Sequence, residues 1–157
     1  MKNVLITTSP FGKINEAPIN LLKKNNINFY SNPKNKKFSR NELLKIIGNY
    51  DGIICGTYKI DRGIINKAKK LKIISRVGIG LDNLDLKSLK KNKIKVAYTP
   101  DAPTQTVAEY TIGLMIYLLR KINVSRKSLK KGKWLKIFGK NLNETKIGII
   151  GFGRIGS

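Results

Sequence analysis

The sequence predicts an α/β fold built on a parallel β-sheet, and two observations support this prediction. From position 1 to about position 98, short apolar runs rich in β-branched residues alternate with stretches that carry helix signals. The apolar runs are continuous, as expected of strands that are buried on both faces. Strands and helices that alternate in this way require right-handed crossovers, which place helices on both faces of the sheet.

Each expected element rests on a local signal in the sequence. The expected strands are Val4–Thr7, Ile27–Tyr30, Gly52–Cys55, Leu71–Ser75 and Ile94–Tyr98. The expected helices are Ala17–Lys24, one from a Ser39 cap to Ile47, Gly63–Lys70, and one that ends near Asn92. Residues typical of turns and loops occupy Ser9–Gly12 and Ser31–Lys37.

Side chains that can cap helices mark where three of these helices begin. Ser39 is followed three residues later by Glu42, the pattern of a capping box. Asp61 can cap the next helix, and either Asp82 or Asp85 can cap the fourth. These caps reinforce the boundaries that the apolar pattern predicts.

The alternation of strands and helices stops at Thr99–Pro103, which we interpret as a domain junction. Beyond it, Thr106 and Glu109 form a second capping-box pattern, and the helix that they open is expected to reach about Lys121. This helix is apolar over most of its circumference and therefore needs cover on several sides. A looser basic segment then leads to a last expected strand, Lys146–Ile150.

The composition excludes several kinds of chemistry. The 157 residues contain one cysteine and no histidine, so they cannot assemble Cys/His zinc sites or catalytic groups that use histidine, and we expect no metal site. Cys55 ends an apolar run, which favours a buried small hydrophobe over a reactive thiol. No apolar run approaches the roughly 20 residues that span a bilayer, and none resembles an export signal. We therefore expect a cytoplasmic protein without a membrane partner.

The formal net charge of +23 raises nucleic acid as a partner. The segment Lys121–Lys146 concentrates this charge. The excess is nearly all lysine, however, and it accompanies abundant asparagine and isoleucine, a composition that A/T-rich codons produce. Arginine, which makes bidentate contacts to phosphates and bases, is sparse, and the basic stretches carry no RNA-binding signature. We therefore expect no nucleic-acid partner.

The segment Gly151–Gly156 has the spacing Gly-x-Gly-x-x-Gly and directly follows the last expected strand. In a dinucleotide-binding turn, the first glycine permits the tight turn, the second lets the backbone approach the pyrophosphate, and the third allows close packing. A helix N-terminus then binds the anion. A purely structural strand-helix turn can carry the same pattern. The acidic residue that distinguishes NAD from NADP is expected roughly 20 positions later, beyond Ser157.

Several stretches together resemble the D-isomer-specific 2-hydroxyacid dehydrogenases, most closely the D-3-phosphoglycerate dehydrogenase branch. They are Leu71–Asp85, Tyr98–Thr104, Thr106–Met115, Gly132–Trp134 and the final glycine motif, in the family's order. The resemblance covers essentially the whole chain. It implies that residues 1–98 form the first part of a flavodoxin-like substrate domain. It also implies that residues 99–157 are the truncated opening of an NAD-binding Rossmann domain.

The resemblance also implies a substrate site on the turn that follows the strand Leu71–Ser75. By position, the backbone of Val77 and Gly78 would hold the substrate carboxylate, and Ile79 would lie beside the cofactor. A glycine-bracketed turn after a parallel strand exposes N–H groups that suit an anion, although a plain structural turn has the same residues. Thr57 lies where family members contact the substrate.

Further positions would contact a nicotinamide cofactor, expected to be NAD with NADP left open. The resemblance places Thr106 near the nicotinamide, although this residue is explained equally well as a helix cap. The remaining expected cofactor contacts are Gly151, Gly153, Arg154, Ile155 and Gly156.

The family passes a hydride between C2 of a 2-hydroxy acid and the nicotinamide ring, using a histidine base, a glutamate that orients it and an arginine that binds the substrate. All three follow the glycine motif in the family, so we assign no catalytic residue in this chain. We expect the full-length protein to be a homodimeric dehydrogenase of a small, phosphoglycerate-like D-2-hydroxy acid or the matching 2-oxo acid. The 157 residues alone are expected to be inactive and prone to self-association. The alternative is a naturally short, non-catalytic interaction module of the same fold.

Overall fold

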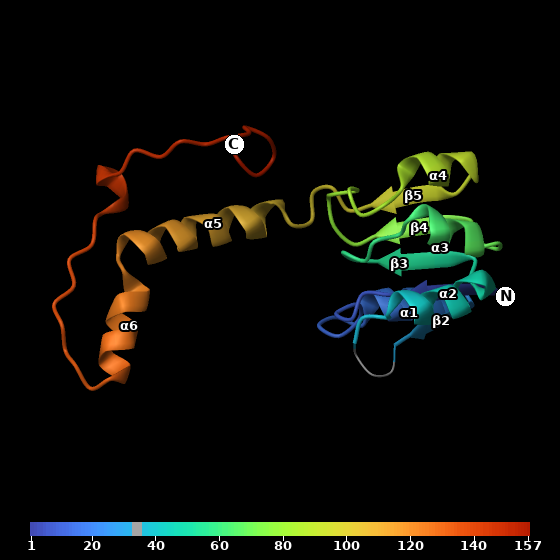
Figure 1. The fold of residues 1–157 in the computed structure, drawn as a ribbon, viewed down its shortest axis with the longest axis horizontal. Helices are drawn as coiled ribbons and strands as arrows, with labels where there is room; N and C mark the ends of the chain where they lie inside the picture. Colours follow the sequence, from blue (N-terminus) through green and yellow to red (C-terminus); the bar gives the residue numbers. More distant parts are fainter. Residues whose placement is uncertain (33–35) are drawn as a thin grey trace. The chain divides into compact units, whose positions relative to one another are not determined.

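The computed structural model describes residues 1–32 and 36–157 and divides the chain into two compact units (Figure 1). Unit 1 comprises Met1–Pro100 and unit 2 comprises Asp101–Ser157. The boundary between them lies within the segment Thr99–Pro103, where the alternation of strands and helices stops. Residues 33–35 of the expected loop Ser31–Lys37 lie outside the described residues.

Unit 1 is a five-stranded parallel sheet with the strand order β2-β1-β3-β4-β5. The strands are β1 (Lys2–Ile6), β2 (Ile27–Ser31), β3 (Gly52–Cys55), β4 (Ile73–Arg76) and β5 (Lys95–Tyr98). The α/β fold and all five strands that the apolar runs predict are confirmed, with ends shifted by a residue or two.

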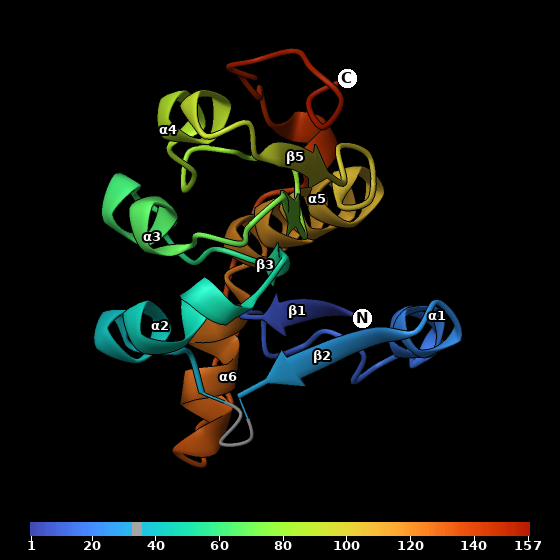
Figure 2. The same cartoon turned by 90° about the vertical axis from the view of Figure 1, so that its right-hand side faces the viewer.

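Helices connect the strands and cover both faces of the sheet. They are α1 (Ala17–Lys24), α2 (Arg40–Ile46), α3 (Arg62–Lys67) and α4 (Leu86–Lys91), with a 3₁₀ turn η1 (Ile47–Asn49) after α2. Figure 2 shows α1 on one face of the sheet and α2, α3 and α4 on the other. No helix among the described residues is both long enough and apolar enough to cross a membrane.

Two of the predicted helix caps are formed as expected. The Ser39 hydroxyl accepts a hydrogen bond from the Glu42 amide at 3.2 Å, and the Glu42 carboxylate accepts one from the Ser39 amide at 2.7 Å. This reciprocal pair is the predicted capping box. The Asp61 carboxylate accepts from the Ile64 amide at 3.0 Å and caps α3.

The structure selects Asp85 over Asp82 as the cap of α4. Its carboxylate accepts hydrogen bonds from the Ser88 amide at 2.9 Å and from the Ser88 hydroxyl at 2.7 Å. Both bonds favour the ionised carboxylate, so the Ser88 amide first and the hydroxyl second lower the pKa of Asp85.

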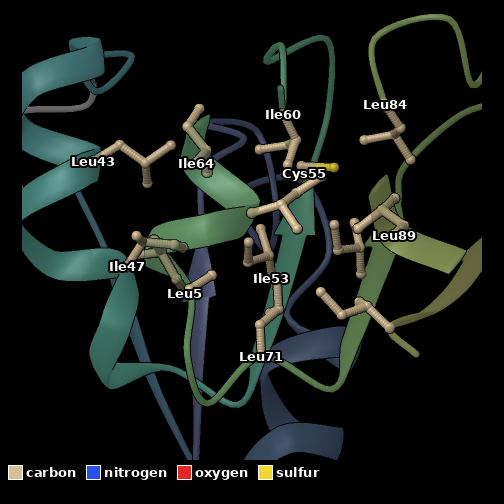
Figure 3. Packing of buried hydrophobic residues seen from close by; sticks show 14 of the residues in the cluster. Leu5, Leu43, Ile47, Ile53, Cys55, Ile60, Ile64, Leu71, Leu84 and Leu89 are labelled. Atoms are coloured by element: carbon tan, nitrogen blue, oxygen red, sulfur yellow. The ribbon is translucent and has the colours of Figure 1, made fainter. Parts of the chain in front are cut away.

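The core of unit 1 lies between the sheet and helices α2 to α4 (Figure 3). Residues from the three central strands interdigitate with residues from these helices. Fully buried members include Leu5, Ile53 and Ile74 from the strands and Leu43, Ile64 and Leu89 from the helices. This layer holds the carboxyl ends of β1, β3 and β4 side by side, and the loops that follow these strands form the candidate site.

Cys55 belongs to this core and has no exposed surface. Desolvation by burial raises the pKa of its thiol to about 11, against a smaller lowering effect of the nearby Arg76 charge. The thiol is therefore protonated at neutral pH, which confirms the interpretation of Cys55 as a buried small hydrophobe.

Unit 2 consists of α5 (Thr104–Leu119), α6 (Ile122–Lys130) and a 3₁₀ turn η2 (Leu142–Glu144), joined by irregular chain. The second capping box is wrong, because α5 begins two residues before Thr106, with Pro103 at the cap position and no side-chain cap. Instead of closing a box, the Glu109 carboxylate accepts a hydrogen bond from the Gln105 amide group at 2.8 Å.

Two further expectations for unit 2 are corrected. The helix α6 lies within the segment that was expected to be loose. The expected strand Lys146–Ile150 is irregular chain, and Ile147, Ile149 and Ile150 are exposed. A strand of a parallel sheet is stabilised by hydrogen bonds to neighbouring strands. Residues 101–157, all of which the structure describes, contain no strand with which this segment could pair.

Candidate functional site

The topology of unit 1 identifies one edge of the sheet as the place for a ligand. In the order β2-β1-β3-β4-β5, the direction of winding reverses between β1 and β3. Parallel α/β sheets bind ligands outside the carboxyl ends of their strands at such a switch point. A cavity of about 370 Å³ lies there, lined by residues that follow β1, β3 and β4.

The cavity brings together two of the predicted substrate residues, Thr57 and Val77. It also contains polar residues that sequence reasoning missed, namely Thr7, Thr8 and Ser9 after β1, and Lys37. The run of three hydroxyl residues directly after the first strand was a usable signal for the first group. Lys37 follows the β2 strand, and only the folded arrangement brings it to the loop after β3.

Thr57 lines this cavity and is exposed. Its hydroxyl accepts a hydrogen bond of 3.4 Å from the Lys37 ammonium group. This distance is at the long limit for such a bond, so the contact leaves the ammonium charge available to a ligand. The two residues together offer a hydroxyl and a positive charge to an oxygen-rich molecule.

Both predicted substrate donors in the turn after β4 already make hydrogen bonds within the chain. The Val77 amide already donates a hydrogen bond of 2.7 Å to the Cys55 carbonyl, which continues the ladder between β3 and β4. The Gly78 amide donates to the Thr99 hydroxyl at 2.8 Å, and the Thr99 amide donates back to the Gly78 carbonyl at 3.1 Å. The Val77 amide is therefore committed to the sheet. The Gly78 amide is released only if the Thr99 hydroxyl turns away.

The next two amides of the turn are free donors. Within the described residues, the amides of Ile79 and Gly80 have no hydrogen-bond partner. Gly80 is exposed and Ile79 is half-buried. Consecutive unpaired N–H groups in a turn suit an anion, and the free donors in this turn begin at Ile79, two residues after the first predicted donor, Val77.

Gly78 fixes the shape of this turn. Its φ is +136°, a conformation that side chains rarely adopt. The Arg76 guanidinium group occupies the space where a Cβ atom of residue 78 would lie, and it donates a hydrogen bond to the Val77 carbonyl. Arg76 Nε is buried and has no partner among the described residues. A positive charge therefore covers the turn that carries the free amides.

Two positions of the glycine motif in unit 2 require glycine. Gly151 has a φ of +91°, and a Cβ atom on Gly156 would collide with the Gly151 carbonyl oxygen. The amides of Gly153, Arg154 and Ile155 have no partner among the described residues. These observations fit a pyrophosphate at the turn.

The other predicted cofactor contacts in unit 2 are not arranged for binding in this structure. The Arg154 guanidinium forms an ion pair of 2.8 Å with the Asp101 carboxylate, and both side chains are largely exposed. No helix follows the turn among residues 151–157. Thr106 is exposed on α5 and caps nothing, so its interpretation as a helix cap is wrong.

Comparison with known proteins shows how far this architecture is shared. Residues 4–149 match the sequence model of the D-isomer specific 2-hydroxyacid dehydrogenase catalytic domain. A hydroxypyruvate reductase of Thermotoga maritima is 45% identical over 120 residues, which is 74% of this chain and 39% of that protein. A D-3-phosphoglycerate dehydrogenase of Archaeoglobus fulgidus is 36% identical over 146 residues, 91% of this chain and 27% of that protein.

Solved structures give the same result. The NAD⁺-bound 3-phosphoglycerate dehydrogenase of Entamoeba histolytica is 31% identical, with a TM-score of 0.78 over 99% of this chain and 48% of that one. The chain therefore spans less than half the length of these relatives. A match over most of the sequence, with the parallel sheet that the residues predict, shows that this chain belongs to the D-isomer specific 2-hydroxyacid dehydrogenase family.

Proposed function

We propose that this chain carries the substrate-binding turn of an enzyme that passes a hydride between a nicotinamide cofactor and C2 of a small, phosphoglycerate-like D-2-hydroxy acid. The observation that carries this proposal is the cavity at the switch point beside a turn with two free amides. Its family membership supports the same reaction class. Residues 1–98 then form the first part of the substrate domain, and residues 99–157 open the nucleotide domain.

The substrate carboxylate is placed on the turn after β4. The amides of Ile79 and Gly80 donate to it, and the Gly78 amide joins them when the Thr99 hydroxyl turns away. The Arg76 guanidinium supplies positive charge over the same turn, which strengthens hydrogen bonds to an anion. This arrangement fixes the acid end of the substrate and leaves C2 and its oxygen facing away from the turn.

The remainder of the substrate enters the cavity. Thr57 and Lys37 there suit an oxygen-rich or negatively charged group, as a phosphoglycerate-like acid carries. Val77, whose side chain is partly exposed, contributes an apolar part of the cavity lining. Contacts with this distal group add binding energy that the bound substrate and the transition state share, which lowers KM.

We propose that the cofactor is NAD. The turn Gly151–Gly156 would hold its pyrophosphate, and the Arg154 side chain would leave its ion pair with Asp101 to contact it. Thr106 and Ile79 are proposed to lie beside the nicotinamide. When bound, the cofactor supplies or accepts the hydride. The 157 residues contain no histidine, and we assign the accompanying proton transfer to none of their side chains. A homodimer of the full-length protein and a cytoplasmic location stay predictions.

This function is tested with the complete protein that contains this chain. It should oxidise NADH with hydroxypyruvate, phosphohydroxypyruvate or glyoxylate, and the 157-residue chain assayed in parallel should show no turnover. Chiral analysis of the product from hydroxypyruvate or phosphohydroxypyruvate should show the D-hydroxy acid. If the complete, folded protein turned over neither NADH nor NADPH with any of these acids, the proposal would be wrong.

A second function, from a different class, is favoured by one observation in unit 2. The apolar residues of α5 are exposed, Tyr110 by 66% and Leu118 by 67%. An exposed apolar surface is typical of interaction sites. A non-catalytic interaction module would use this surface in the 157-residue chain itself, and sedimentation of that chain with and without detergent would show whether it self-associates.

A further inference from the structure

One side chain joins the loop after β4 to the loop after β3. Asn83 lies between β4 and α4, and its Nδ2 group donates to the Gly56 carbonyl at 3.1 Å and to the Tyr58 carbonyl at 2.7 Å. These two carbonyls flank Thr57. The amide group of Asn83 therefore holds the backbone on both sides of the residue that lines the cavity.

The backbone around Asn83 makes this contact rigid. The Ile60 amide donates to the Asn83 carbonyl at 2.8 Å, and the Asp85 amide donates to the Ile60 carbonyl at 3.1 Å. Ile60 and Leu84 form an isolated parallel bridge, and both are buried. Because these bonds fix the position of Asn83, the hydrogen bonds from its side chain hold the loop Gly56–Tyr58 in one place.

The chemistry of the contact requires an NH₂ group. Each carbonyl accepts one of the two Nδ2 hydrogens, whereas Oδ1 is buried and has no partner among the described residues. If the amide were turned over, Oδ1 would face two carbonyl oxygens, so the assigned orientation is the one that electrostatics allows. An ionised aspartate would have the same shape but no hydrogen to donate.

Apart from the two Asn83 hydrogen bonds to its neighbours, few interactions set the position of Thr57. Among the described residues its one side-chain hydrogen bond is the 3.4 Å contact with the exposed Lys37, which is too long to fix a rotamer. We propose that Asn83 is a positioning residue that sets the place of Thr57 in the substrate cavity and, through it, the affinity for substrate. This inference rests on the proposed function, because Thr57 must contact the substrate.

The test uses steady-state kinetics of the complete protein with hydroxypyruvate. Asn83→Ala is expected to raise KM about tenfold with kcat within about twofold, because uniform binding is lost and no interaction specific to the transition state is touched. Thr57→Val should raise KM by a similar factor. The double variant should be no worse than the more affected single variant, since both changes remove one interaction and such effects do not add.

Two further variants keep the result interpretable. Asn92→Ala is the matched control, because Asn92 Nδ2 also donates to a carbonyl, that of Ser88 at 2.8 Å, away from the cavity; its KM should be unchanged. Asn83→Ser retains one donor and is expected to raise KM about threefold, which allows the test if the alanine variant does not fold. KM effects of Asn83→Ala and Thr57→Val that multiply in the double variant, or an unchanged KM in both Asn83 variants, would overturn the inference. An inactive wild-type protein would instead refute the proposed function.

Discussion

Replacing Gly78 with alanine is expected to lower kcat/KM of the complete protein for 2-oxo acids by about a hundredfold, the loss associated with misplacing a binding group by about 1 Å. The backbone requires glycine here, because a φ of +136° is strained for any side chain. An added Cβ atom would also meet the Arg76 guanidinium, which would have to move. An added methyl group must therefore move the turn or expel Arg76. Either change displaces the amides that are proposed to bind the carboxylate.

The control for this prediction lies two residues further along the same turn. Gly80 does not have a positive φ in the strained range, and a Cβ atom there would meet only Asp82 Oδ1 at 2.8 Å, the end of a side chain that can rotate. Gly80→Ala should therefore lower kcat/KM by less than about tenfold, a cost of less than about 1.4 kcal/mol. Steady-state kinetics of both variants, with circular dichroism to confirm folding, decides the matter. Equal losses in the two variants would contradict the role assigned to Gly78.

Replacing Ile53 with alanine is expected to lower the free energy of unfolding by about 2–5 kcal/mol, the range for such changes at buried sites. Ile53 lies on the central strand β3, and only 1% of its surface is exposed. Truncation leaves a cavity between the sheet and its covering helices, which close packing prevents from collapsing fully. A loss of this size is a large fraction of the stability of a small domain.

The neighbouring strand provides a matched substitution. Ile73 on β4 has the same side chain in the same secondary structure, but 41% of its surface is exposed. Ile73→Ala should cost less than about half as much, because hydrophobic stabilisation follows the apolar area removed from water. Urea unfolding followed by far-ultraviolet circular dichroism measures both values. Similar losses would show that β3 is not the centre of the core.

Elements of unit 1 were predictable because their signals are local. The apolar runs that form β1 to β5 need both faces covered, and the chain between them supplies the helices that cover them. The cap at Asp61 depends on atoms within a few residues and was also predictable. Asp82 and Asp85 were indistinguishable by type and spacing, and only the contacts of Ser88 with Asp85 separate them.

Unit 2 shows where local signals fail. Lys146–Ile150 has the composition of a strand, but a strand needs neighbours, and residues 101–157 contain none. Thr106 and Glu109 have the spacing of a capping box, yet the chain turns into the helix earlier, at Pro103. The apolar surface of α5, which the sequence pattern indicated would need cover, is exposed in this chain.

The candidate site was predictable as a region but not as a set of donors. Its glycine turn after β4 and Thr57 after β3 could be found from sequence. Which amides are free could not, because the Gly78 amide is engaged by Thr99, 21 residues away. Lys37 is likewise 20 residues from Thr57. Contacts at such separations are set by the sheet and not by the residues near the turn.

The central claim is that the turn Gly78–Gly80 binds the carboxylate of a 2-oxo acid. It is tested most directly by following the backbone amide resonances of the complete protein by NMR during titration with hydroxypyruvate, and separately with hydroxyacetone, which replaces the carboxylate by a methyl group. The amides of Gly78, Ile79 and Gly80 should shift to saturation with hydroxypyruvate and stay in place with hydroxyacetone. If these three amides stayed in place with both compounds, or shifted equally with both, carboxylate recognition by this turn would be contradicted.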